Sequence, residues 1–164
     1  MIPDAPFLLS LAALNASLAG LGGLLVGLRR ASGFDPLDSL RLRQVVEFAF
    51  ANLLLAIAVQ PLAQLLGDIG SAVRLSSAVT LVYVVVALLV LDRRVARVGI
   101  VWGRSWAASA IGLTVIGALV SAAAIVVPST GMYELLLVVM LARPIAVFLL
   151  VLGTIDDGAR VSPP

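Results

Sequence analysis

The sequence predicts an all-α fold, a polytopic integral membrane bundle of five transmembrane helices that forms a single domain over residues 1–164. The composition is 62% hydrophobic and only 12% charged, with a mean hydropathy of +1.16, whereas a soluble domain is about half apolar. Five apolar stretches are each long enough to cross a bilayer. The arginines fall mostly on alternate connecting segments, which is typical of helices that cross a membrane in alternating directions.

The first two spans are expected at 7–28 and 45–66. Arg29-Arg30 closes the first one, and because these arginines follow the apolar run rather than precede it, we expect a retained helix and not a cleaved signal peptide. Asp35-Pro36 reads as an N-cap followed by proline at the first helical position. The second helix is therefore expected to begin about two turns before it enters the lipid.

The remaining spans are expected at 75–91, 107–127 and 133–152. The third is the shortest and is closed by Asp92-Arg93-Arg94, while Pro128 ends the fourth. All five are expected to be helical, because a backbone that crosses lipid must satisfy its own hydrogen bonds.

The arginine distribution predicts the orientation in the membrane. One side of the predicted bundle carries nine arginines: Arg29, Arg30, Arg41, Arg43, Arg93, Arg94, Arg97, Arg104 and Arg160. The other side carries only Arg74, and Arg143 lies inside a span. The positive-inside rule then places the N-terminus outside and the C-terminus inside. The use of arginine for all eleven basic residues favours a GC-rich bacterial source, so we expect the bacterial cytoplasmic (inner) membrane.

The segment between the third and fourth spans is expected to be amphipathic. Its apolar residues recur at three- and four-residue steps: Leu91, Val95, Val98, Trp102 and Trp106. This pattern is typical of a segment lying in the membrane interface. It is interpreted either as an anchor with an aromatic belt or as a docking site for anionic lipid head groups or a partner.

Small residues predict where helices approach each other closely. Ala19, Gly23 and Gly27 repeat every four residues along the first span, and such residues allow close packing in a membrane. The stripe is expected to pack within the chain, and the alternative is the seam of a homo-oligomer.

The polar residues at membrane depth are the candidate site, because each is costly there. Arg143 lies near the middle of the fifth span and precedes Pro144, which removes a backbone hydrogen bond. The hypothesis is a buried ion pair between Glu47 and Arg143, to which Asn52 adds a hydrogen bond. The rival partner for Glu47 is Arg43, one turn earlier on the same helix.

Two further polar residues, Asn15 and Gln60, are expected toward the periplasmic half of the membrane. Asn15 is expected to form an interhelical hydrogen bond worth about 0.6 kcal/mol. Gln60 shares a broad helix face with Asn52, whereas Glu47 points elsewhere. This placement weakens the interpretation of the second helix as a continuous polar path.

The composition also narrows the possible chemistry. The chain contains no cysteine and no histidine. Without cysteine it can form no disulfide and has no thiolate ligand, and without histidine it lacks the commonest metal ligand and general base. Its carboxylates are few and scattered, and no catalytic, metal or cofactor motif is present. We therefore expect a protein that is not an enzyme, and the net charge of +2 is too small to predict nucleic-acid binding.

Several stretches resemble small polytopic bacterial inner-membrane proteins that have no assigned function. They are the ends of the first two helices, Gly27-Leu28-Arg29-Arg30 and Gln60-Pro61-Leu62, and the segment Arg41-Leu42-Arg43-Gln44-Val45-Val46-Glu47. The resemblance implies a bacterial inner membrane and assigns no site.

Two function classes lead. The first is a structural or accessory subunit of a membrane assembly, because a small chain with short loops and packing glycines suits a protein whose partners supply the chemistry. The second is a small transporter or channel component with a cytoplasm-facing polar pocket around Arg143, which would need a homo-oligomer. The expected partners are the lipid bilayer and either copies of the chain or a larger membrane complex.

Overall fold

The computed structural model describes residues 5–29, 36–98 and 104–160, with the backbone alone described at the helix ends next to the gaps. Within these residues every regular element is an α-helix, as predicted, and short connections lie at 67–68 and 127–129. The elements are α1 (Ala5–Arg29), α2 (Pro36–Leu66), α3 (Ile69–Val98), α4 (Arg104–Val126) and α5 (Thr130–Arg160).

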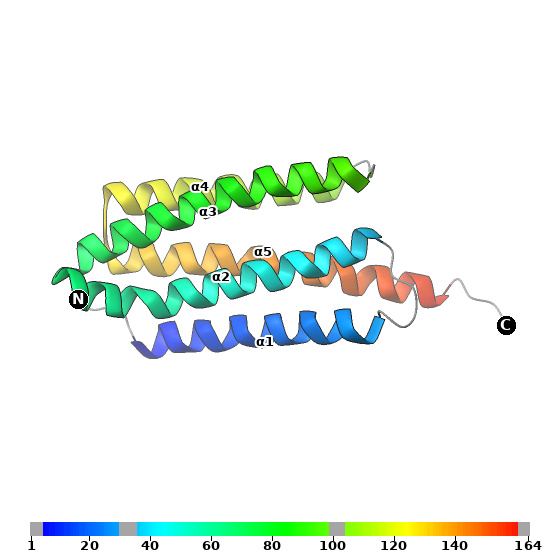
Figure 1. Cartoon of the computed structure of the whole chain (residues 1–164), viewed down its shortest axis with the longest axis horizontal. Coiled ribbons are helices and arrows are strands. Elements are labelled where there is room, and N and C mark those ends of the chain that lie inside the picture. The colour runs from blue at the N-terminus through cyan, green and yellow to red at the C-terminus, as the bar shows by residue number, and fades with distance from the viewer. Residues whose placement is uncertain (1–4, 30–35, 99–103, 161–164) are drawn as a thin grey trace.

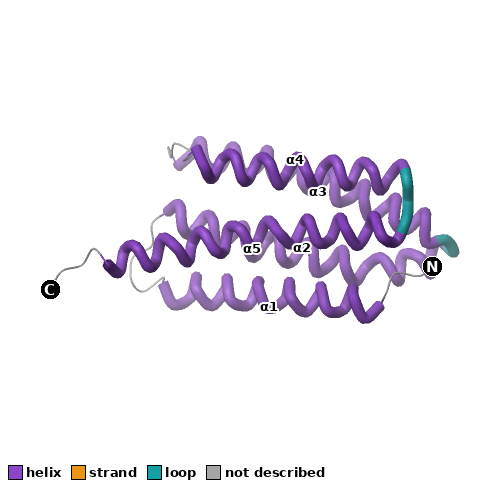
Figure 2. Tube along the Cα trace, turned by 180° about the vertical axis from the view of Figure 1, so that it is seen from behind, coloured by secondary structure: helices purple, strands orange, loops and turns teal. Residues whose placement is uncertain are grey.

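The helices form a ring of four with a fifth helix outside it. In the ring, α2 packs on α3, α3 on α4, α4 on α5, and α5 returns to α2, while α1 lies outside against α2 and α5 (Figures 1 and 2). Successive helices run in opposite directions, so that α1, α3 and α5 all end at the end of the bundle where α2 and α4 begin (Figure 1). Helix ends therefore alternate between the two ends of the bundle.

The prediction of a multi-pass membrane protein is confirmed for four helices. Their stretches are long and apolar enough to cross a membrane: Ala5–Gly27, Ser39–Leu66, Ile69–Val90 and Thr130–Leu152. In α4 the part with described side chains contains a shorter apolar stretch, Ile111–Val126. The fifth span remains a prediction.

Two helices extend beyond the apolar spans predicted for them. Helix α3 begins at Ile69, before the predicted span at 75–91. The predicted interfacial segment over 91–106 is not a separate element, since residues 91–98 continue α3 and 104–106 begin α4. Residues 99–103, with Trp102, lie outside the described residues.

A tight turn joins α2 to α3. Gly67 has a φ of 67°, the left-handed conformation that commonly ends a helix at glycine. The carboxylate of Asp68 then accepts hydrogen bonds from the backbone N–H groups of Gly70 (3.1 Å) and Ser71 (2.7 Å) and from the Ser71 hydroxyl (2.8 Å). The bonds from Ser71 are the main reason that the pKa of Asp68 lies below its usual value. Asp68 thus caps the N-terminus of α3.

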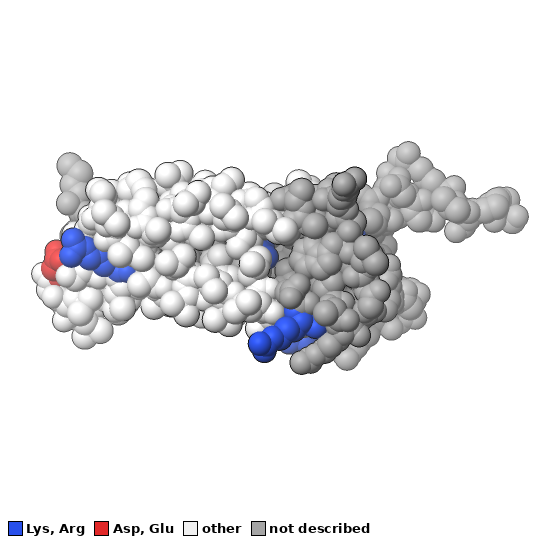
Figure 3. Space-filling model, turned by 90° about the horizontal axis from the view of Figure 1, so that it is seen from above, with Lys and Arg blue, Asp and Glu red and all other residues white. Residues whose placement is uncertain are grey.

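The outer surface of the bundle is largely apolar. Large side chains such as Leu65 (82% exposed) and Val126 (74%) face outward on several helices. Figure 3 shows a broad band of uncharged side chains, with charged ones at the left-hand end and beside the grey region. An apolar exterior of this extent is typical of a surface that contacts lipid or another protein.

Candidate functional site

The Arg143 side chain is buried between three helices. It projects from α5 with only 4% of the residue exposed. Its Nη1 donates a hydrogen bond of 2.9 Å to the Thr114 hydroxyl on α4, and its guanidinium carbon lies 4.0 Å from the centre of the Phe48 ring on α2. A cation over an aromatic face is attracted by the ring quadrupole. Arg143 therefore connects α5 to both α4 and α2.

The predicted ion pair between Glu47 and Arg143 is not formed among the described residues. The Glu47 carboxylate instead pairs with Arg43, the rival partner, at 2.7 Å between Oε1 and Nε. Phe48, the residue after Glu47, occupies the inward position beside Arg143, which leaves Glu47 on the outer side of α2. Arg43 lies one turn earlier on that same side. The second amino group of Arg143, Nη2, is buried and has no hydrogen-bond partner among the residues that the structure describes.

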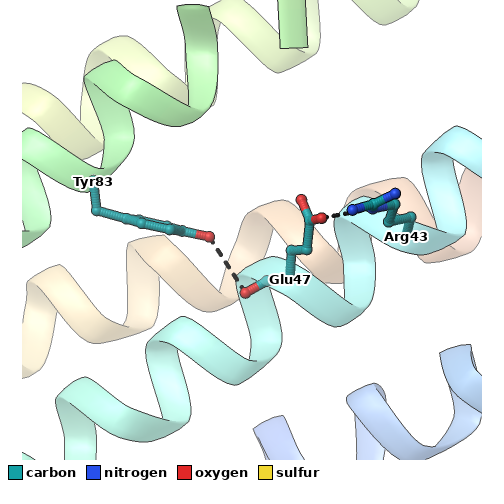
Figure 4. Close-up of polar contacts among 3 residues, drawn as sticks. All are labelled: Arg43, Glu47 and Tyr83. Carbon is teal, nitrogen blue, oxygen red and sulfur yellow. Dashed lines mark hydrogen bonds and ion pairs between the residues drawn. The ribbon is translucent and has the colours of Figure 1, made fainter. Parts of the chain in front are cut away.

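Tyr83 connects α3 to this part of α2. Its hydroxyl donates a hydrogen bond of 3.3 Å to the backbone carbonyl of Glu47, and its ring meets the edge of Phe48 with the ring centroids 5.5 Å apart. Figure 4 shows Tyr83 reaching the backbone of Glu47 on α2 from α3, while the Glu47 side chain pairs with Arg43 one turn earlier on α2. Phe48 is thus contacted by both Tyr83 and Arg143, and it links three helices of the ring.

Asn52 bonds to α1 and α5 rather than to Arg143. Its Nδ2 donates to the Asn15 Oδ1 at 3.3 Å and to the Leu137 carbonyl at 3.1 Å, and both asparagines are completely buried. The interhelical hydrogen bond predicted for Asn15 is therefore confirmed. The site predicted from Glu47, Asn52 and Arg143 divides into three groups: a surface ion pair, an asparagine bridge and a buried arginine.

Sequence reasoning missed the hydroxyl groups inside the ring. Tyr133 is fully buried on α5 and donates a 2.7 Å bond to the Leu55 carbonyl on α2. Ser77 on α3 and Ser121 on α4 are buried with no hydrogen-bond partner for their hydroxyls. A signal was present, because Thr114 and Ser121 are seven residues apart and so share one face of α4.

The predicted packing stripe of α1 is only partly correct. Ala19 is buried at 9% exposure, but a Cβ built on Gly23 or Gly27 has no other atom within 4 Å. Gly22 makes the close approach instead, because a Cβ there would lie 3.0 Å from the Val46 Cγ2 on α2. The helix phase explains the difference: Gly22 lies seven residues after the buried Asn15, on the same face.

The described hollows lie away from Arg143. One of about 610 Å³ opens at the connection of α2 and α3, beside Gln60, Gln64 and Asp68. In the described part of the chain, no three carboxylate, histidine or cysteine side chains come together as a metal site would require. The buried polar side chains of Asn52, Tyr133 and Arg143 form hydrogen bonds between helices.

Comparison of the chain with protein-family models, with curated proteins and with solved structures gave no match.

Proposed function

We propose that the chain is a five-span protein of the bacterial inner membrane that serves as a structural or accessory subunit of a membrane assembly. The observation that carries the proposal is the use of the buried polar side chains. Arg143 contacts α4 and α2, and Asn52 contacts α1 and α5. Each therefore joins its own helix to two others. Polar groups used in this way fix helix positions, which suits a scaffold whose partners supply the chemistry.

Native mass spectrometry of the full chain, extracted gently with its own lipids, tests the proposal. A second polypeptide at a fixed stoichiometry is expected, and its loss on mild dilution would indicate a weak accessory contact. A homo-oligomer with no other polypeptide would contradict the accessory role. That result would favour the second candidate, a transporter or channel component.

The second candidate function rests on a specific observation. The Arg143 Nη2 is buried without a hydrogen-bond partner among the described residues, and Arg143 precedes Pro144, which frees the Met140 carbonyl from its usual backbone bond although α5 continues through it. Polar side chains beside freed backbone carbonyls resemble the substrate sites of transporters, which form where helices are broken. For a homo-oligomer, anion flux through proteoliposomes containing wild-type or Arg143→Met protein is the decisive measurement.

The proposed orientation, with the N-terminus outside and the C-terminus inside, has its own test. The chain has no native cysteine, so single cysteines can be introduced at the exposed residues Ser39 and Gln64, toward opposite ends of α2. A membrane-impermeant maleimide added to intact spheroplasts is expected to label Gln64→Cys and to spare Ser39→Cys until the membrane is opened. The reverse pattern would invert the orientation, and labelling of both before opening would contradict a spanning α2.

A further inference from the structure

Two apolar hollows lie on either side of the outer ridge of α2. The first, of about 400 Å³, lies between α2 and α3 and is lined by large side chains that include Phe50, Leu54 and Val86. The second, of about 430 Å³, lies between α1 and α2 and extends toward the N-terminal end of α2, with Gly23, Val26 and Val46 in its lining beside the polar residues Ser39, Arg43 and Glu47. Phe50, Leu54 and Val86 are each at least 50% exposed, so this hollow faces outward.

A single ion pair lies between the two hollows. Glu47 lines both of them, and Arg43 lines the second. The Arg43 side chain is 65% exposed and the Glu47 side chain 40% exposed. The Arg43 Nε lies 2.7 Å from the Glu47 Oε1 (Figure 4). The bond uses only Nε of Arg43, and a guanidinium has four further N–H donors. The ridge therefore presents a positive and a negative group side by side, above apolar surface on either side.

We propose that this ridge binds one phosphatidylethanolamine molecule. The lipid phosphate accepts hydrogen bonds from Arg43, its ammonium donates to the Glu47 carboxylate, and one of its acyl chains lies in the hollow between α2 and α3, which runs from Glu47 toward Leu54. The inference rests on the proposed membrane insertion, and it names a lipid of a different charge from the anionic head groups expected from the sequence.

The charge pattern selects this head group over the other common ones. A phosphatidylglycerol offers a phosphate to Arg43 but leaves the carboxylate facing a head group with no cation. A phosphatidylcholine carries a cation without N–H donors, so it cannot form a charge-assisted hydrogen bond with Glu47. Only an ethanolamine head group matches both members of the pair.

The test is native mass spectrometry of the purified full chain in micelles with equal amounts of phosphatidylethanolamine, phosphatidylcholine and phosphatidylglycerol. The wild-type chain is expected to retain one phosphatidylethanolamine in preference to the other two. In the Arg43→Gln/Glu47→Gln variant the apparent Kd for this lipid should rise about tenfold, because both charged partners are removed. Arg74→Gln, which removes an exposed arginine at the other end of the bundle, is the matched control and should bind as the wild type does.

A second variant addresses the hollow between α2 and α3. Ala51→Phe enlarges a half-buried side chain that lines this hollow, so it should occupy the space of the acyl chain and weaken retention of phosphatidylethanolamine without unfolding the chain. Equal or stronger retention of phosphatidylglycerol by the wild type, or an unchanged preference in the double variant, would overturn the lipid site. Release of the chain from membranes by alkaline carbonate would instead overturn the membrane proposal, so the two failures are distinguishable.

Discussion

Replacement of Arg143 by methionine is expected to leave the bundle folded and to raise its free energy of unfolding by about 1–4 kcal/mol, as in other proteins whose buried ionic groups were replaced by well-packed apolar residues. Arg143 is 4% exposed, and its Nη2 has no hydrogen-bond partner in the described part of the chain. Methionine keeps an apolar contact with Phe48 and removes the unpaired group. The Thr114 hydroxyl, which accepts the Arg143 bond, can then donate to a backbone carbonyl of the preceding turn of α4.

The measurement is the SDS-induced unfolding curve of the purified chain in mixed micelles, followed by far-UV circular dichroism. Leu136→Met, at a fully buried position of the same helix, is the control for introducing methionine, and it should change the stability by less than about 1.5 kcal/mol. Arg143→Lys should destabilise the bundle, because an ammonium keeps the charge but lacks the planar face that stacks on Phe48. A clear loss of stability in Arg143→Met would mean that the contacts with Thr114 and Phe48 outweigh the cost of burial.

The second large effect is expected at the contact between α1 and α2. Gly22→Leu should lower the free energy of unfolding by about 1–3 kcal/mol, because inserted side-chain volume forces a packed interface apart. The first added carbon alone would lie 3.0 Å from the Val46 Cγ2, and valine in a helix has one strongly preferred rotamer and cannot turn away at low cost.

Gly23→Leu is the matched control for this prediction. It makes the same chemical change on the same helix and has the same helix propensity, but its Cβ meets no other atom within 4 Å. Its stability should stay close to that of the wild type. If both variants were equally destabilised, the cost would come from the helix itself or from an oligomer seam, and not from the contact with α2.

The sequence predicted the elements of the fold well and its contacts less well. Apolar length alone locates a membrane helix, and Asp35-Pro36 correctly placed the start of α2 ahead of the lipid, at Pro36. The predicted third span begins at Leu75, directly after Arg74, whereas α3 begins at Ile69, because a helix can extend beyond its apolar span. Ser76 and Ser77 lie within the predicted span, and in the structure both are buried.

The contacts were harder because a membrane helix is apolar on its lipid-facing side as well as on its packed side. Periodicity in α1 therefore could not distinguish Gly22 from Gly23, and the four-residue spacing favoured the wrong one. Glu47 and Arg143 attract each other by charge, but the rotation of α2 directs Phe48 and not Glu47 toward Arg143. Asn15 was predicted correctly because an amide in lipid needs a partner from another helix.

The bridges between α2 and α5 have a consequence for how the chain assembles. The Asn52–Leu137 and Tyr133–Leu55 hydrogen bonds join residues 85 and 78 positions apart, whereas the Asn52–Asn15 bond spans only 37. During synthesis the N-terminal part folds first, so α1 and α2 can join while the later helices are still being made. The ring closes only when α5 arrives. In a nascent chain stalled before α5, α1 and α2 are therefore already paired, but the ring is still open on one side. Assembly of the bundle is completed only when α5 has been made.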